Sequence, residues 1–208
     1  YGVLTGKNIV ITTNNDSVYQ TAIELHEAGS KVTVLDSRKN INVDLPKEIE
    51  LHLETLPFSI NGRKKIESLD VCKATDKANK YTIICDQVLV SGGWSPIVNL
   101  VSHRGIKPVW NEDNLCFVPG EIKENITVVG SARGIWNSDD CVKSGIVGAN
   151  EAMNTLGIQK KEIAFPSIGG WSNPIDALFE VKSNKFPSKS FIDFQHDDRF
   201  QRITTDWI

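Results

Sequence analysis

Residues 7–36 read KNIVITTNNDSVYQTAIELHEAGSKVTVLD, and three patterns follow one another in this stretch. Its first seven residues are a β-branched run that predicts a buried strand. Apolar side chains then recur at helical spacing over 18–28, and Gly29 ends the helix, as glycine commonly does. A second strand lies within 31–38 and ends in Asp36. A strand, a helix and a second strand ending in an acid are typical of the β-α-β unit of a dinucleotide-binding fold.

The turn between the first strand and the helix lacks the glycines that such a fold normally carries. Residues 12–17 read TTNNDS, with Asp16 or Ser17 as the expected helix N-cap. Without a G-x-G-x-x-G pattern the backbone cannot approach a pyrophosphate closely, and Asp16 adds negative charge where phosphates would lie. Asp36 has two interpretations, a ligand of the ribose hydroxyls or an ordinary capping or solvated residue. We therefore expect the turn geometry of a dinucleotide site with weakened phosphate chemistry.

Further short strands follow this unit. Asn61-Gly62 separates two alternating runs, one over residues 50–60 and one after the turn. This pattern predicts a hairpin. Another strand is expected over 80–93, KYTIICDQVLVSGG. Three short strands after a β-α-β unit indicate a β-meander. The expected fold class is α/β, a three-layer Rossmann-like nucleotide-binding subdomain with a β-meander, inserted in a two-dinucleotide-binding flavoprotein fold.

A second close-approach turn lies in ITVVGSARGIW, residues 126–136. The apolar residues 126–129 predict a strand, and small residues follow it before a helix that carries Gly145, Gly148 and Ala149. A face of small residues lets a helix lie close to a sheet or to a bound nucleotide. Two interpretations stay open, a ligand contact and a turn that packs against a sheet alone.

Composition narrows the class of protein. The net charge of −3 gives no electrostatic reason to expect nucleic acid or an anionic membrane as a partner. Four cysteines without a CxxC pair predict no metal site, and reduced, mostly buried thiols in a cytoplasmic protein. The four histidines lack an evident orienting carboxylate, so we expect no catalytic residue in this chain.

Several segments together resemble the alpha subunit of heterotetrameric sarcosine oxidase and related multi-subunit amino-acid dehydrogenases. They occur in the family's order along nearly the whole chain, as YGVLTGKNIVITTNNDSVYQTAIELHEAG (1–29), CDQVLVSGGWSPIVNLVSHRG (85–105), FVPGE (117–121), VVGSARGIW (128–136) and SFIDFQHD (190–197). The resemblance implies an alpha subunit that holds NAD and a beta subunit that holds FAD and oxidises the amine. It also implies FMN between the subunits and a tetrahydrofolate-binding domain at the end of the alpha subunit.

The resemblance implies that this chain is the middle of such a subunit, with residues 1–110 as an inserted Rossmann-like subdomain with a β-meander. Residues 111–157 would be the closing strand and helix of the outer nucleotide-binding fold, and 158–208 a loop-rich connection leading to the next domain. The implied function is dinucleotide binding and subunit scaffolding in the oxidative demethylation of sarcosine or a related secondary amine. The cofactor-binding residues that it implies are Gly130, Ala132, Gly134, Ile135 and Asn137, with Asp36 as a further candidate.

Two other functions are compatible with the residues. One is a stand-alone pyridine-nucleotide-dependent FAD oxidoreductase, against which the absent CxxC pair and the absent glycine motif argue. The other is a scaffold module that binds no nucleotide.

Overall fold

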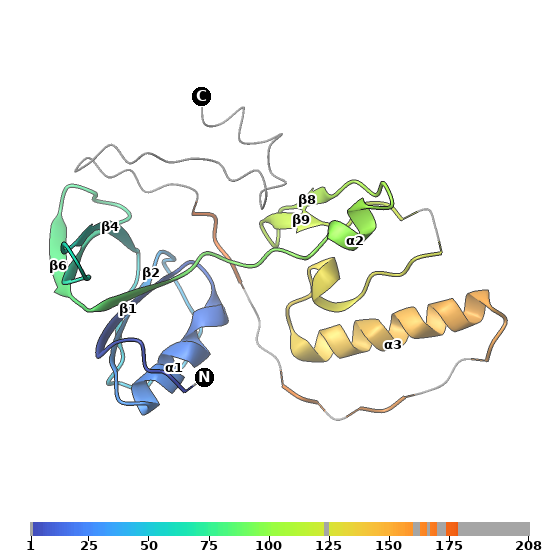
Figure 1. The fold of residues 1–208 in the computed structure, drawn as a ribbon, viewed down its shortest axis with the longest axis horizontal. Coiled ribbons are helices and arrows are strands. Elements are labelled where there is room, and N and C mark those ends of the chain that lie inside the picture. The colour runs from blue at the N-terminus through green and yellow to red at the C-terminus, as the bar shows by residue number, and fades with distance from the viewer. Residues whose placement is uncertain (1, 123–124, 160–162, 166, 170–173, 179–208) are drawn as a thin grey trace. The chain divides into compact units, whose positions relative to one another are not determined.

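The computed structural model describes residues 2–122, 125–159, 163–165, 167–169 and 174–178. These residues form two compact units (Figure 1). The sheet unit consists of residues 2–93 and 174–178, and the helix unit of the described residues between 94 and 169. The segment at 190–197 that contributed to the family resemblance lies outside the described residues.

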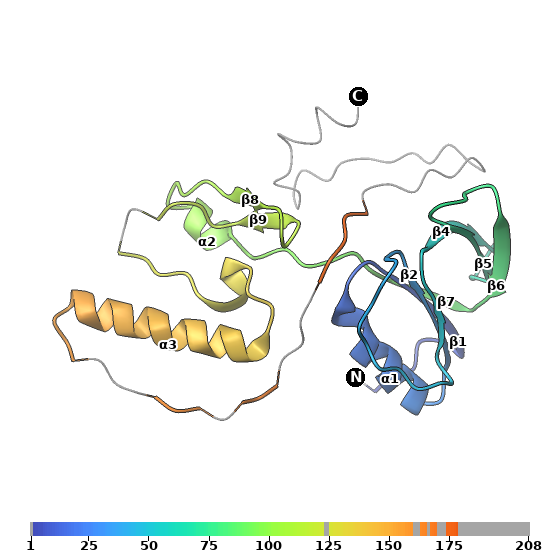
Figure 2. The same cartoon turned by 180° about the vertical axis from the view of Figure 1, so that it is seen from behind.

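The sheet unit is built on a four-stranded parallel sheet in the order β3-β2-β1-β7, and Figure 2 shows β7 beside β1. A single-turn helix, η1 (Asp16–Val18), leads into α1 (Tyr19–Glu27) between the first two strands. The strands are β1 (Asn8–Thr13), β2 (Lys31–Asp36), β3 (Glu50–His52) and β7 (Gln87–Ser91). This confirms the predicted β-α-β unit, with Asp36 as the last residue of its second strand and Gly29 in a left-handed conformation after α1.

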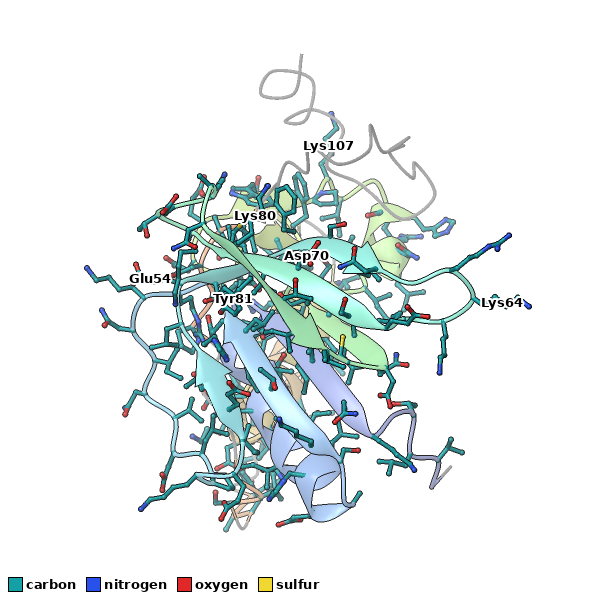
Figure 3. All side chains as sticks on the ribbon, turned by 90° about the vertical axis from the view of Figure 1, so that its left-hand side faces the viewer. Glu54, Lys64, Asp70, Lys80, Tyr81 and Lys107 are labelled. Carbon is teal, nitrogen blue, oxygen red and sulfur yellow. The ribbon has the colours of Figure 1, made fainter. Side chains whose placement is uncertain are left out.

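Both faces of this sheet are covered, because successive side chains of a strand point to opposite sides. Ile9 and Ile11 of β1 pack in one core with Tyr19 and Ala22 of α1, whereas Val10 packs in another core with Leu69. The second core lies under an antiparallel meander of order β4-β5-β6, which Figure 3 shows with Asp70, Lys80 and Tyr81 labelled. Its strands are β4 (Thr55–Asn61), β5 (Ser68–Lys73) and β6 (Lys80–Ile84). Helix, sheet and meander form the three predicted layers.

Two of the predicted strands are each two strands in the structure. The 50–60 run breaks at Glu54, whose φ of 51° turns the chain from β3 of the main sheet into β4 of the meander. The 80–93 run breaks before Asp86, whose carboxylate accepts hydrogen bonds from the N–H groups of Lys7 and Asn8 and so fixes the start of β7 beside β1. Sequence alternation did not reveal these breaks, because both pieces of each run are strands and only their partners differ.

The predicted hairpin between β4 and β5 is confirmed, but its loop is longer than two residues. The Glu67 N–H donates to the Asn61 carbonyl across the loop, at 3.0 Å. Gly62 has a φ of 133°, and a Cβ there would lie 2.0 Å from the Lys65 carbonyl oxygen. Only glycine fits this corner.

The predicted helix N-cap, Asp16 or Ser17, is wrong. Asn15, and not Asp16 or Ser17, accepts the capping hydrogen bond, from the Ser17 N–H to its side-chain oxygen at 3.0 Å. The residue type is the expected one, because an amide oxygen caps a helix as well as a carboxylate or hydroxyl does.

The helix unit contains one long helix and several short elements, which are coloured green to orange in Figure 1. These elements are α2 (Asn99–Ser102), β8 (Val109–Asn111), β9 (Cys116–Val118), η2 (Gly130–Arg133) and α3 (Ser138–Thr155). β8 and β9 form an antiparallel pair. In neither unit do the described residues include a helix with the length and apolar character that crossing a bilayer requires.

The strand predicted at 126–129 is not a strand in the structure. Its side chains alternate as a strand's would: Ile126 and Val128 pack on the small apolar core of α2, and Thr127 and Val129 contact α3 at Gly148. None of the described residues forms a β-ladder with it. Ile126, Val128 and Val129 are half-buried, and an apolar pattern cannot separate such packing from strand pairing.

The small-residue face predicted on α3 is reduced to one position. A Cβ at Gly148 would lie 2.7 Å from Val129 Cγ1, so this glycine permits the close approach. Gly145 has open space where a Cβ would lie, and Ala149 is exposed.

Candidate dinucleotide site

The loop after β1 is held by its own side chains. The Asn15 N–H donates to Thr13 Oγ1 at 3.2 Å, and that hydroxyl donates to the Asn15 carbonyl at 2.9 Å. Asn15 is fully buried and its side chain caps η1 through the Ser17 N–H. The N–H groups of Asn15 and Ser17 are therefore already bonded at the position where a phosphate-binding loop presents donors.

Hydrogen bonds link the end of β7 to the loop after β1. The β1–β2 connection and the chain leading to β7 run to opposite sides of β1, and open α/β sheets bind ligands at such a switch point. Here Asn15 Nδ2 donates to the Ser91 carbonyl at 3.2 Å, and the hydroxyls of Ser17 and Ser91 lie 2.9 Å apart. These contacts tie the end of β7 to the loop that follows β1.

A buried ionic network lies at the ends of β1 and β2. Arg38 Nη2 contacts an oxygen of Asp16 at 2.6 Å and an oxygen of Asp36 at 2.7 Å. Asp36 is fully buried, and it also accepts hydrogen bonds from the Tyr19 hydroxyl at 2.6 Å and the Arg38 N–H at 2.9 Å. Burial and then the hydrogen bond to Asp36 raise the pKa of Tyr19. Burial alone would lower the pKa of Arg38, but its hydrogen bonds to Asp36 and Asp16 outweigh this and raise it.

This edge of the sheet does not fit a dinucleotide diphosphate. Two carboxylates and one guanidinium leave a local excess of negative charge, and Gly is absent from residues 12–17. The role of Asp36 toward a ribose remains a prediction, and the structure gives its carboxylate an internal role with Arg38 and Tyr19. A ribose could reach Asp36 only if that network opened.

The second predicted element, the turn before α3, has the expected backbone. Gly130 and Gly134 lie at the two ends of η2 with φ values of 63° and 85°, in the left-handed region that favours glycine. The Gly130 N–H donates to Ser144 Oγ at 2.8 Å, and the Ile135 N–H to the Gly130 carbonyl at 3.3 Å. The Asn137 side chain caps α3 through the Asp140 N–H at 3.2 Å.

The predicted contact residues differ in their accessibility. Gly134 is buried, and a Cβ there would meet Val118 Cγ1 at 2.9 Å, so its missing side chain serves packing within the helix unit. Gly130, Ala132, Ile135 and Asn137 are partly exposed. Four of the five predicted residues thus line an accessible turn, and Gly134 shapes it from within.

The start of α3 carries acidic groups. Asp139 and Asp140 lie in its first turn. Asp139 accepts hydrogen bonds from the Ser167 hydroxyl and, at 2.8 Å, from the Ile168 N–H, and these bonds lower its pKa. A diphosphate would meet two carboxylates here, whereas ribose hydroxyls can donate hydrogen bonds to carboxylates. The chemistry of this turn suits the sugar part of a nucleotide better than its phosphates.

Sequence reasoning missed a groove of about 360 Å³ on the sheet unit. It lies between the ends of β1 and β7 and the strand β4, and its lining is mainly apolar, with Phe58 and Leu178 among the apolar residues. Its polar lining residues are Thr12, Thr13, Asn14, Ser59 and Ser91. Residues from separate strands and from 174–178 meet there, and no local motif marks such a convergence.

The described ranges contain no candidate metal-binding cluster. No group of three or more His, Cys, Asp or Glu side chains there is placed to hold a metal ion. Cys72, Cys85 and Cys116 are buried, as predicted for most of the thiols, and Cys141 is partly exposed. Burial, and then the neighbouring Asp86 charge, raise the pKa of Cys85.

Comparison with curated proteins finds sequence similarity along almost the whole chain. The chain is 32% identical over 208 residues to the sarcosine oxidase subunit alpha of Rhizobium meliloti (strain 1021), which covers 98% of this chain. The resemblance to sarcosine oxidase alpha subunits is confirmed. A second sarcosine oxidase subunit alpha, from Corynebacterium sp. (strain U-96), is 27% identical over 171 residues, or 77% of this chain.

The chain spans only about a fifth of the length of these alpha subunits, 20% and 18% respectively. No family model matches the chain. The similarity to sarcosine oxidase alpha subunits therefore rests on the pairwise comparisons and concerns one part of those proteins.

Solved structures support the fold class. The chain is similar to thioredoxin reductase from Lactococcus lactis with a TM-score of 0.57 and 20% identity, over 72% of this chain and 53% of that one. Bacillithiol disulfide reductase from Staphylococcus aureus gives a TM-score of 0.54 and 19% identity, over 73% of this chain and 51% of that one. The predicted α/β, Rossmann-like fold is confirmed.

Proposed function

We propose that this chain is the portion of a sarcosine-oxidase-type alpha subunit that supplies one rim of an NAD site and a scaffold for the other subunits. The similarity to the Rhizobium meliloti subunit over 98% of the chain is the observation that carries this proposal. The oxidation of sarcosine or a related secondary amine takes place elsewhere in the complex, with FAD on a beta subunit and FMN between the subunits. A tetrahydrofolate domain would belong to another part of the alpha subunit.

The turn at 130–137 is the element through which this chain contacts NAD. Gly130 allows the chain to turn sharply, and Ala132 and Ile135 lie on its accessible side. The acidic first turn of α3 favours a ribose over the diphosphate at this place. Residues 111–157 would then be the closing part of an outer nucleotide-binding fold, in which 126–129 gains strand partners from the rest of the subunit.

The sheet unit acts as a scaffold in this proposal. At its conventional dinucleotide edge, polar groups are bonded to one another in the Asn15–Ser91 contact and the Asp16–Arg38–Asp36 network. The same observation favours the second candidate function, a scaffold module that binds no nucleotide anywhere in this chain. The two candidates differ only at the turn before α3.

NADH titration of the ¹⁵N-labelled chain, followed by amide chemical shifts, distinguishes them. We expect shifts at Gly130, Ala132 and Ile135. Ala132→Leu should weaken binding by about tenfold or more, equivalent to about 1.4 kcal/mol, because the larger side chain blocks the close approach. Ala149→Leu is the matched control, since Ala149 is exposed on α3 and outside the turn.

Equal NADH affinity in the two variants would show that the turn makes no contact. Absence of any NADH-dependent shift in the wild-type chain would favour the scaffold function for this chain.

A further inference from the structure

The short segment 174–178 lies against the carboxyl edge of the sheet unit, by which we mean the C-terminal ends of β1, β2 and β7 and the loop at 14–17. Ile175 forms an antiparallel bridge with Asn15. The Asp176 N–H donates to the Asn14 carbonyl at 3.1 Å, and Asn14 Nδ2 donates to the Asp176 carbonyl at 2.7 Å. Asn14 therefore binds both backbone polar groups of Asp176, which is how one peptide segment recognises another.

A charged donor binds the same segment. Arg38 Nη1 donates to the Pro174 carbonyl at 2.8 Å, while Nη2 of the same guanidinium holds Asp16 and Asp36. The planar guanidinium presents its donors in a fixed fork, so the two carboxylates orient Nη1 toward the carbonyl. This contact is independent of the Asn14 hydrogen bonds.

Apolar contacts complete the site. A Cβ at Gly93 would lie 2.6 Å from Ile175 Cδ1, so the bare glycine makes room for that side chain. Leu178 lines the groove of about 360 Å³ together with Phe58. Ile175 and Leu178 are three residues apart and anchor the segment at two places.

We propose that the carboxyl edge of the sheet unit is a binding site for an extended peptide, and that residues 174–178 of this chain are its occupant. The site takes peptide in place of the dinucleotide that this edge binds in a Rossmann-type fold. The Asn14 backbone carbonyl accepts a hydrogen bond from a peptide N–H, and the Asn14 side-chain amide and the Arg38 guanidinium donate to peptide carbonyls. An apolar groove receives peptide side chains. The excess of carboxylates at the same edge disfavours a diphosphate.

Hydrogen exchange at the Asp176 amide tests the proposal in the full chain. In the wild type this amide should exchange at least about tenfold more slowly than an unstructured one, because its N–H donates to the Asn14 backbone carbonyl and the Asn14 side chain holds the Asp176 carbonyl. Ile175→Gly and Asn14→Ala should each speed its exchange severalfold. Amides of β1 serve as the check that the sheet unit remains folded.

Two matched controls separate docking from general loosening. Ile168→Gly removes an exposed isoleucine of the helix unit, and Asn40→Ala an exposed asparagine of the sheet unit. Neither should change exchange at Asp176. The proposal is overturned if Asp176 exchanges at the unstructured rate in the wild type, or if the docking and control variants behave alike while β1 stays protected.

NADH provides the competing occupant. The proposal expects exchange at Asp176 to be unchanged in saturating NADH, and an acceleration by NADH would show that the edge binds a dinucleotide and overturn it. Shifts at Gly130 and Ala132 report on the proposed function separately. Either conclusion can fail without the other.

Discussion

Replacing Arg38 with alanine removes the single positive charge between two carboxylates at the sheet edge. The Arg38 and Asp36 side chains are 3% and 0% exposed, and the guanidinium contacts Asp36 at 2.7 Å and Asp16 at 2.6 Å. Its Nη1 also holds the Pro174 carbonyl. The substitution therefore leaves a buried carboxylate without its counter-ion and frees one anchor of the 174–178 segment.

The expected cost is about 3 kcal/mol in the free energy of unfolding of the sheet unit. Removing one partner of a buried ion pair costs about 3–5 kcal/mol. The lower end applies because Asp36 keeps two other donors, the Tyr19 hydroxyl and the backbone N–H of position 38. Arg38→Lys keeps the charge but loses the fork, so we expect about half of that loss.

The aromatic residues allow the two units to be followed separately. The three tyrosines stand at positions 1, 19 and 81, and all five tryptophans at position 94 or later. Tyr19 and Tyr81 belong to the sheet unit, and Trp94, Trp110 and Trp136 to the helix unit. Urea unfolding is therefore monitored by the tyrosine ring signals in NMR spectra for the sheet unit and by tryptophan fluorescence for the helix unit. We expect the tyrosine transition to move to lower urea in Arg38→Ala and the tryptophan transition to stay in place.

Arg63→Ala is the matched control, because Arg63 is exposed in the β4–β5 loop. A loss below about 1 kcal/mol in Arg38→Ala, the range of a surface ion pair, would refute the stabilising role of the network. A loss equal to that of Arg63→Ala would refute it as well.

Three further predictions follow from single contacts. The pKa of Tyr19 is raised on folding, so its contribution to the free energy of unfolding is present below the unfolded pKa near 10 and is lost as pH rises above that value. In urea titrations, the free energy of unfolding of Tyr19→Phe should therefore fall less steeply in alkali than that of the wild type. Gly148→Ala should destabilise the helix unit by about 1–3 kcal/mol through overpacking against residues 127 and 129. Gly145→Ala has open space at its Cβ and should stabilise the unit by about 0.5–1 kcal/mol. Melting followed by tryptophan fluorescence compares the two variants, and equal effects would contradict the packing at Gly148. The lowered pKa of Asp139 means that its hydrogen bond from the Ile168 N–H is present above the ordinary pKa of 3.8 and is lost as pH falls through the lower folded pKa. The amide chemical shift of Ile168, followed into acid, checks this, and Asp139→Asn should lose the response.

Local patterns were sufficient for the β-α-β unit. The β-branched run of β1, the helical spacing of α1 and the glycine after it each have a local physical cause, so residues 7–36 predicted those elements and the position of Asp36. The absence of glycine from residues 12–17 predicted weakened phosphate chemistry, and in the structure the N–H groups of Asn15 and Ser17 are bonded within the loop. The small residues after 126–129 predicted the turn before α3, and the family resemblance added NAD as its ligand, a contact that stays a prediction.

The sequence by itself determined which segments of the sheet unit are extended, which segment is helical and where the turns at 12–17 and 61–62 lie, because those choices depend on side chains within a few residues of one another. Only the tertiary structure decided which partner each segment took. It divided the 50–60 and 80–93 runs between two sheets, left 126–129 without a ladder among the described residues, and brought Arg38 to Asp16 and Pro174. Those contacts join residues 22 and 136 positions apart, and their free energy depends on burial and charge at a common place in space, which spacing along a chain does not encode.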